Sequence, residues 1–179
     1  MDFTKVVQAI TIQQCPEWCW AASIAMIFTF SGHPIDQKQI VQQTYGNIVC
    51  LPAQNNATIA SALSRRYVDA NGKPFTSRIT AAFDAQAGFV GINNGIIVNA
   101  LQSNQPLLIC NTHHAMVVCA ADFAPTPFGP NIYALGVVDP WPYSSRFHPL
   151  SQAEIVPMGI PLGMGQQGQM MFVATVSVT

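Results

Sequence analysis

The residues from Cys19 to Phe28 form an apolar run that constrains the fold more than any other part of the chain. Because apolar side chains follow one another with almost no polar face, a helix here has to be buried on nearly all sides. The apolar stretch from Ala21 to Phe30 is about ten residues long, whereas a helix that spans a bilayer needs about 20. The pattern therefore predicts a core helix that ends near Gly32 and has Cys19 in its first turn.

The composition is that of a folded protein with very few charges. Of the 179 residues, 50% are hydrophobic and 8% are charged, against about 25% charged residues in average soluble chains. This balance excludes an intrinsically disordered chain. The formal net charge is −1 and no run of basic residues could neutralise several phosphates, so we expect no binding to nucleic acid. The length is near that of one domain, and we expect residues 1–179 to form a single one.

The chain shows no signal for a membrane or for ordinary secretion. Its first residues, from Met1 to Lys5, carry an acid where a signal peptide has basic residues, and no hydrophobic region with a small-residue cleavage site follows. We therefore expect no membrane association. The expected location is the cytoplasm, or outside it after export by a route that needs no signal peptide.

The periodicity of the apolar residues predicts helices in the first half of the chain and strands in the second. The predicted elements of the first half are a strand over 6–12, helices over 19–32, 36–45 and 57–66, a short strand over 79–86 and a helix over 94–106. Those of the second half are strands over 107–110, 114–121, 132–138 and 170–178, with loops over 124–131, 139–149 and 157–168. Helices followed by strands favour an α+β fold with two lobes and a cleft between them.

Cys19 is the residue best placed for covalent chemistry. At the N-terminus of a buried helix, unpaired N–H groups and the positive end of the helix dipole stabilise a thiolate. A thiolate nucleophile needs a partner that takes and returns a proton, and histidine has a suitable pKa. His113 and His114 begin a predicted strand after a polar turn. Alternation places His114 on the face of Met116 and Val118 and His113 on the opposite face, but it does not decide which face is inside. We interpret His113 as a residue that faces solvent or bonds to the loop.

Asp139 is the candidate for orienting the imidazole of His114. It directly follows the predicted strand over 132–138. The start of one antiparallel strand lies beside the end of the next, so His114 and Asp139 can meet across the pair. His33 and His148 each stand beside a proline, and we interpret both as loop histidines.

The segment Gln13–Ala22, with the sequence QQCPEWCWAA, resembles the nucleophile segment of papain-like cysteine peptidases. In that family the histidine is followed by alanine and a hydrophobic strand, which His114–Val118 matches. The family's asparagine or aspartate has a tryptophan two residues further on, as Asp139 has in Trp141. The short length, the Cys-Trp-Ala-Ala start and the aspartate resemble the compact bacterial branch, which includes effector proteases delivered into host cells and peptidases related to bacteriocin processing.

The resemblance implies a papain-like two-lobed fold. Its N-terminal helical lobe, about 13–105, would carry the nucleophile helix. Its C-terminal lobe, about 106–179, would be an antiparallel sheet that also includes the N-terminal strand. The family's glutamine, six residues before the nucleophile, falls on Gln13. The amide of Gln13 would complete the oxyanion hole, with Gln14 as the alternative.

The cysteines depart from the pattern of the plant and lysosomal enzymes, which have a cysteine three residues before the nucleophile. Here that position is Pro16 and the cysteine is Cys15, so a disulfide between Cys15 and Cys50 stays open. We interpret Cys110 and Cys119, on predicted strands, as reduced thiols of the core.

The function that the resemblance implies is that of a cysteine peptidase, which hydrolyses peptide or isopeptide bonds through a thioester acyl-enzyme. Cys19 would attack the carbonyl, His114 would exchange the proton and Asp139 would orient the imidazole. Neither a cofactor nor a metal is expected, and the cysteines contain no CxxC pair.

Two alternatives remain: another acyl transfer by the same residues, as in transglutaminase-like enzymes, amidases or cell-wall hydrolases, and a catalytically silent binding module. The expected partner is a peptide or protein substrate, and the expected state is a monomer.

Overall fold

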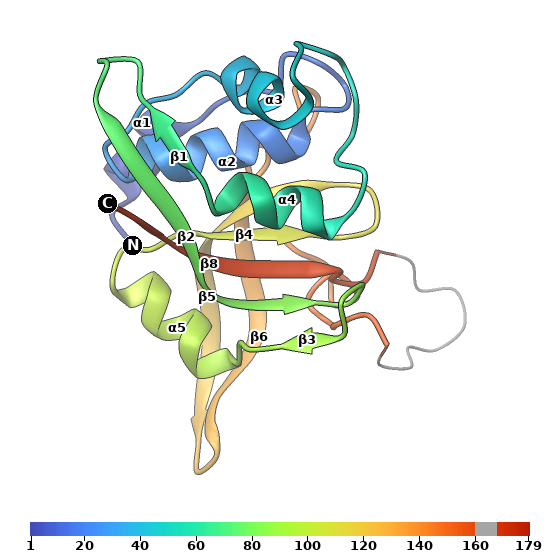
Figure 1. Ribbon diagram of the computed structural model, residues 1–179. Coiled ribbons are helices and arrows are strands. Elements are labelled where there is room, and N and C mark those ends of the chain that lie inside the picture. Colours follow the sequence, from blue (N-terminus) through green and yellow to red (C-terminus); the bar gives the residue numbers. More distant parts are fainter. Residues whose placement is uncertain (160–167) are drawn as a thin grey trace.

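The computed structural model describes residues 1–159 and 168–179 and shows helices packed on an antiparallel sheet (Figure 1). The helices are α1 (Phe3–Ala9), α2 (Cys19–Phe30), α3 (Gln37–Tyr45), α4 (Asn56–Leu63) and α5 (Asn94–Gln102). The strands are β1 (Arg66–Val68), β2 (Pro74–Asp84), β3 (Phe89–Val90), β4 (Leu107–Cys110), β5 (Ala115–Thr126), β6 (Gly129–Val138), β7 (Phe147–Pro149) and β8 (Phe172–Val178). The predicted α+β class is confirmed. Of the predicted loop over 157–168, residues 160–167 lie outside the described residues.

The strands follow the order β1-β2-β8-β4-β5-β6-β7, with β3 paired to β2. All of these pairs are antiparallel. Strand β8, at the end of the chain, lies between β2 and β4, so it joins strands from the first and the second half (Figure 1). Strands β1 to β3 thus come from the part of the chain that the sequence predicts as mainly helical.

The first element is a helix, so the predicted strand over 6–12 is wrong. The side chain of Asp2 accepts hydrogen bonds from two backbone N–H groups of the first turn and thereby caps α1. Val6 and Ala9, three residues apart on one helix face, are buried in the core. Capping and burial at helical spacing therefore outweigh the β-propensity of the branched residues.

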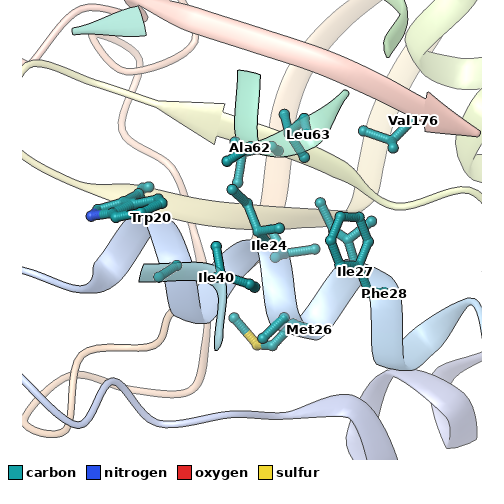
Figure 2. Close-up of a cluster of buried hydrophobic side chains, with 14 of the residues drawn as sticks. Trp20, Ile24, Met26, Ile27, Phe28, Ile40, Ala62, Leu63 and Val176 are labelled. Carbon is teal, nitrogen blue, oxygen red and sulfur yellow. The ribbon is translucent and has the colours of Figure 1, made fainter. Parts of the chain in front are cut away.

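Helix α2 is buried on nearly all sides, as its apolar run predicts. Figure 2 shows side chains of Trp20–Phe28 packed against Ile40 of α3, Leu63 of α4 and Val176 of β8. Helices α1, α3 and α4 and the sheet therefore share one core around α2. In the described part of the chain, no helix has the length and the apolar character to cross a bilayer.

The polar residue in the middle of α2 fixes the helix to the sheet. Ser23 is fully buried, and its hydroxyl donates a hydrogen bond to the carbonyl oxygen of Ala115 at 3.0 Å. Ala115 is the first residue of β5. The start of α2 is thereby held near the start of β5, where the sequence places the candidate histidine.

The sheet is covered on both faces. Helices α1 to α4 belong to the core on one side of the sheet and α5 to the core on the other. Along β5, the first core contains Ala115, Val117 and Cys119, and the second contains Met116 and Val118. A strand buried on both faces has a continuous apolar run instead of alternation, which is the pattern of this segment.

Several boundaries differ from those predicted. The predicted loop over 124–131 is a hairpin, because β5 and β6 pair as far as Thr126 and Gly129. Gly129 has a φ of 111°, which favours glycine, and its carbonyl accepts the Thr126 hydroxyl at 2.6 Å. Helix α4 ends at Leu63, earlier than predicted, and β7 lies within the predicted loop over 139–149.

Gln37 is a buried polar residue that fixes the segment before α2. Its side chain is fully buried, although it lies at the start of α3. Its Nε2 donates to the carbonyl of Ile12 at 2.8 Å, and its Oε1 accepts from the N–H of Gln14 at 3.0 Å. The amide thus supplies the hydrogen bonds that a neighbouring strand would otherwise give to the backbone of residues 12–14. This segment precedes Cys19 in the chain.

We expect Gln37→Ala to lower the free energy of unfolding by about 1–3 kcal/mol, because it leaves partly buried backbone groups of Ile12 and Gln14 without their partner. Gln42→Ala, on an exposed position of the same helix, is the matched control and should change the free energy by less than about 0.5 kcal/mol. Urea unfolding of both variants measures this. Equal effects of the two changes would contradict the clamping role of Gln37.

Candidate active site

A cleft of about 410 Å³ opens at the start of α2. Its walls come from the first residues of α2, the segment 52–56, the turn over 110–115 and the loop after β6. The lining residues include Cys19, Trp20, Gln54, Asn55, Asn56, Asn111, His113, His114 and Trp141. A cleft of this volume is large enough for a small molecule or part of a peptide.

Cys19 is the first residue of α2 and is partly exposed in this cleft. Cys110 and Cys119 also carry free thiols, but both are buried. The N-cap residue of α2, Trp18, makes no capping hydrogen bond with its side chain. Within the described residues, the backbone N–H of Cys19 has no hydrogen-bond acceptor either. The helix therefore presents an unpaired N–H and its positive end beside the thiol.

His114 lies in a turn that Asn111 holds in shape. The Oδ1 of Asn111 accepts hydrogen bonds from the backbone N–H groups of His113 and His114, at 2.9 and 2.8 Å. Its Nδ2 donates to Oε1 of Glu154 at 3.1 Å. Sequence reasoning missed both supporting residues, although an asparagine that accepts from the following N–H groups is a common turn signal.

The structure brings Cys19, His114 and Asp139 together. The Nε2 of His114 lies 2.6 Å from Oδ1 of Asp139, which also accepts the N–H of Trp141 at 2.7 Å. Cys19 lines the same cleft as His114 and is close enough to raise the pKa of its imidazole. Because Asp139 occupies Nε2, the nitrogen that remains for the thiol is Nδ1.

Strand alternation does not explain this arrangement. Alternation predicts that His114 shares the face of Met116 and Val118, which belong to the core on the far side of the sheet from α2. His114 instead contacts Cys19 on the α2 side. The prediction is wrong because His114 precedes β5 and lies in the Asn111 turn, to which the period of two does not extend. His113 is exposed, as predicted.

Opposing effects act on the pKa of both members of the His114–Asp139 pair. Burial of the imidazole is the largest and lowers the pKa of His114, but the hydrogen bonds to Asp139 and Cys19 and their charges together raise it from 6.5 to about 9. Burial also raises the pKa of Asp139. Hydrogen bonds from His114, the Trp141 N–H and Ser144 outweigh it and hold that pKa well below its usual range. At neutral pH the geometry therefore favours an imidazolium beside a carboxylate.

Gln13 does not line the cleft. Its side chain is buried, and its Nε2 donates to the carbonyls of Cys15 and Pro16, at 3.0 and 2.7 Å. This differs from the predicted position in an oxyanion hole, because both N–H groups of the amide are used within the loop before α2. The backbone N–H of Gln13 donates to Pro140 at 3.0 Å and so ties this loop to the one that carries Asp139. The alternative, Gln14, is exposed.

A second histidine contacts Asp139. The Nε2 of His148 lies 3.3 Å from Oδ2 of Asp139, the oxygen that His114 does not use. His148 belongs to β7 and pairs with Val137 of β6, so its interpretation as a loop histidine is wrong. No sequence pattern indicated this contact, since β7 is only three residues long and lies in a predicted loop.

The wall opposite His114 is fixed by covalent and polar contacts. Cys15 and Cys50 form a disulfide, with their Cα atoms 6.0 Å apart, which decides the pairing that the sequence left open. The indole N–H groups of Trp18 and Trp20 donate to the carbonyls of residues 49 and 51, at 2.8 and 3.4 Å. The segment after α3 is thereby held against the start of α2.

The other free thiols have raised pKa values. Burial, together with the nearby Cys19, raises the pKa of Cys110 well above its ordinary range. Burial raises the pKa of Cys119 to about 11. Both fit the predicted role of core thiols, although Cys110 also lines the cleft. Among the residues that the structure describes, no group of three His, Cys, Asp or Glu side chains is arranged to hold a metal ion.

We expect the stability that His114 contributes to disappear at alkaline pH. The pKa of His114 is about 9 in the folded protein, above its ordinary 6.5, so the contribution is complete below pH 6.5 and is lost as pH rises through 9. The difference in unfolding free energy between the wild type and His114→Gln should therefore shrink by up to about 3 kcal/mol between pH 6 and 10. Urea unfolding at several pH values measures it, and a difference that stays constant would contradict the charged pair.

Comparison with known proteins supports one family. Residues 2–152 match the family described as papain-like cysteine protease AvrRpt2. A search among curated proteins finds no match. The matched segment covers most of the chain and includes Cys19, His114 and Asp139. The chain therefore belongs to this effector-type family of papain-like cysteine proteases, in agreement with the resemblance of its nucleophile segment.

Proposed function

We propose that the protein is a cysteine peptidase that hydrolyses peptide or isopeptide bonds of a peptide or protein substrate. The observation that carries this proposal is the contact series from the partly exposed Cys19, through the imidazole of His114, to the carboxylate of Asp139 at 2.6 Å. Membership of a papain-like protease family supports the same activity.

In the first half-reaction, the Cys19 sulfur attacks the carbonyl carbon of the scissile bond while His114 holds the proton of the thiol. The resulting tetrahedral intermediate collapses, the bond to the leaving amine breaks, and the imidazolium of His114 gives its proton to that amine. A thioester between Cys19 and the acyl group remains. Water then attacks the thioester while His114 takes a proton from the water. The carbon–sulfur bond breaks, the carboxylic acid is released, and the imidazolium of His114 returns its proton to the sulfur of Cys19.

The oxyanion of both tetrahedral intermediates needs a hydrogen-bond donor. We assign this role to the backbone N–H of Cys19, which has no acceptor among the described residues and lies at the positive end of α2. The predicted second donor, Gln13, would have to exchange its hydrogen bonds to Cys15 and Pro16 for one to the oxyanion.

We expect Cys19→Ala to abolish peptide hydrolysis and leave the fold intact, because the thiol is partly exposed and contributes reactivity more than packing. Cys119→Ala is the matched control, since it removes a buried thiol outside the cleft and should retain activity. Mass spectrometry after brief treatment with iodoacetamide should find the label on Cys19 in the wild type. A folded Cys19→Ala variant that keeps more than a few per cent of the activity would exclude Cys19 from the mechanism.

Analysis of the products separates the alternatives. A peptidase cleaves its substrate into two peptides, or, at an isopeptide bond, separates two chains and leaves a free lysine amine on one of them. A transglutaminase-like enzyme instead joins the acyl group to an added amine. If the protein cleaves cell-wall peptides and no other peptide substrate, it is a cell-wall hydrolase. Labelling of Cys19 without turnover on any of these substrates would favour a silent binding module.

Asp139→Asn should retain part of the activity and Asp139→Ala should retain less. The amide oxygen of asparagine can still accept the Nε2–H of His114 and hold the ring, whereas alanine leaves the imidazole free to rotate. Loss of the negative charge should also lower the pKa of His114 and move the alkaline limb of the pH–rate profile to lower pH. Equally poor variants with unchanged profiles would mean that another group orients His114.

A further inference from the structure

We propose that His148 is a positioning residue for the candidate active site: it holds the second oxygen of Asp139 and so fixes the carboxylate that orients His114. The inference rests on the proposed function of this site. His148 does not line the cleft, so it acts on the reaction only through Asp139.

The sheet brings His148 to this position. Strand β7 pairs with the end of β6, so that His148 lies opposite Val137, two residues before Asp139. The backbone pairing continues past the strand end, because the N–H of Asp139 donates to the carbonyl of Arg146 at 3.0 Å. Just beyond this strand end, the Nε2 of His148 reaches the Oδ2 of Asp139 at 3.3 Å. The edge strand therefore presents His148 to the carboxylate.

The two oxygens of Asp139 have different partners. Oδ1 accepts from His114 and from the backbone N–H of Trp141, at 2.6 and 2.7 Å. Oδ2 faces Nε2 of His148 at 3.3 Å. Ser144, which also lowers the pKa of Asp139, lies near this carboxylate but donates its hydroxyl hydrogen to the carbonyl of Trp141 at 3.2 Å. Without a donor at Oδ2, the carboxylate could rotate about its bond to Cβ. This rotation would weaken the hydrogen bond between Oδ1 and His114. A donor on each oxygen fixes its plane, and with it the direction of the imidazole of His114.

The ring of His148 can serve as this donor in both charge states. Its Nδ1 lies 3.1 Å from the carbonyl of Pro149, which only accepts hydrogen bonds. An imidazolium satisfies both contacts, whereas the neutral ring satisfies Asp139 when its hydrogen is on Nε2. The side chain is 29% exposed, so water can replace Pro149 as the partner of Nδ1.

Few charged groups surround this ring in the described part of the chain. Asp139 faces it from the end of β6, and His114 lies beyond the shared carboxylate. Arg146 of the neighbouring loop is bound to the backbone carbonyls of residues 139, 141 and 142. A groove beside His148 is lined by Asp122 of β5 and by the uncharged Phe3 of α1. Asp139 is the carboxylate that contacts the ring.

Two substitutions separate positioning from packing. His148→Gln keeps an N–H donor at about the reach of Nε2 but loses the ring, whereas His148→Phe keeps the ring shape and loses the donor. If His148 positions Asp139, the Gln variant should behave like the wild type and the Phe variant should be impaired. A packing role predicts the opposite order. Thermal unfolding establishes the temperature at which both variants are folded.

The readout is the rate at which iodoacetate alkylates Cys19, measured against pH. The carboxylate of this reagent is attracted by the imidazolium of His114, so the rate should fall as His114 loses its proton near pH 9 in the wild type and in His148→Gln. In His148→Phe the alkaline limb should move to lower pH. The rate at pH 7 should fall by about three- to tenfold, as expected for the loss of one orienting hydrogen bond. With a peptide substrate, kcat should fall and KM should stay unchanged.

A His148→Phe profile like that of the wild type, or a Gln variant as impaired as the Phe variant, would overturn the positioning role while leaving the proposed peptidase function intact. If wild-type Cys19 were alkylated no faster than Cys119, the proposed function itself would fail, and the role of His148 with it. The alkylation assay thus distinguishes the two failures.

Discussion

The burial of α2 is the constraint on which the rest of the structure depends. A helix that is apolar on nearly all sides is stable only when other elements cover it, and here α3, α4 and the sheet do so (Figure 2). The buried hydroxyl of Ser23 then bonds to the first residue of β5 at 3.0 Å, which sets the position of the helix on the sheet. Since Cys19 begins this helix and His114 directly precedes this strand, the packing that buries α2 also brings the thiol to the imidazole.

The candidate site is a junction between the helices and the end of the sheet, and its precision depends on residues that do no chemistry. Gln37 fixes the backbone before Cys19, Asn111 fixes the turn that carries His114, and the N–H of Gln13 joins the first loop to Pro140, beside Asp139. Each of these bonds uses a buried or partly buried backbone group that would otherwise lack a partner. The candidate catalytic groups are therefore held by hydrogen bonds that the fold needs for its own stability.

The sequence pointed to the candidate site residues more clearly than to the residues that support them. The flanking pattern of Cys19 and the order of Cys19, His114 and Asp139 indicated the family, and the helical period indicated α2 and α5. The strand over 6–12 was mispredicted, because capping by Asp2 and packing of one helix face are tertiary and local effects that β-propensity does not contain. The contact of His148 could not be predicted, since it depends on a three-residue edge strand whose register only the assembled sheet defines.

The shared carboxylate also gives a physical reason for aspartate at position 139. Two imidazoles direct their Nε2 at this side chain, one to each oxygen, at 2.6 and 3.3 Å. A carboxylate accepts at both oxygens, whereas an asparagine offers one oxygen and one NH2 group, which only donates. With asparagine, one of the histidines would face a donor and would have to turn away or move its own hydrogen to Nδ1. An amide is sufficient to orient a single histidine, but the His114–Asp139–His148 arrangement requires two acceptors on one side chain.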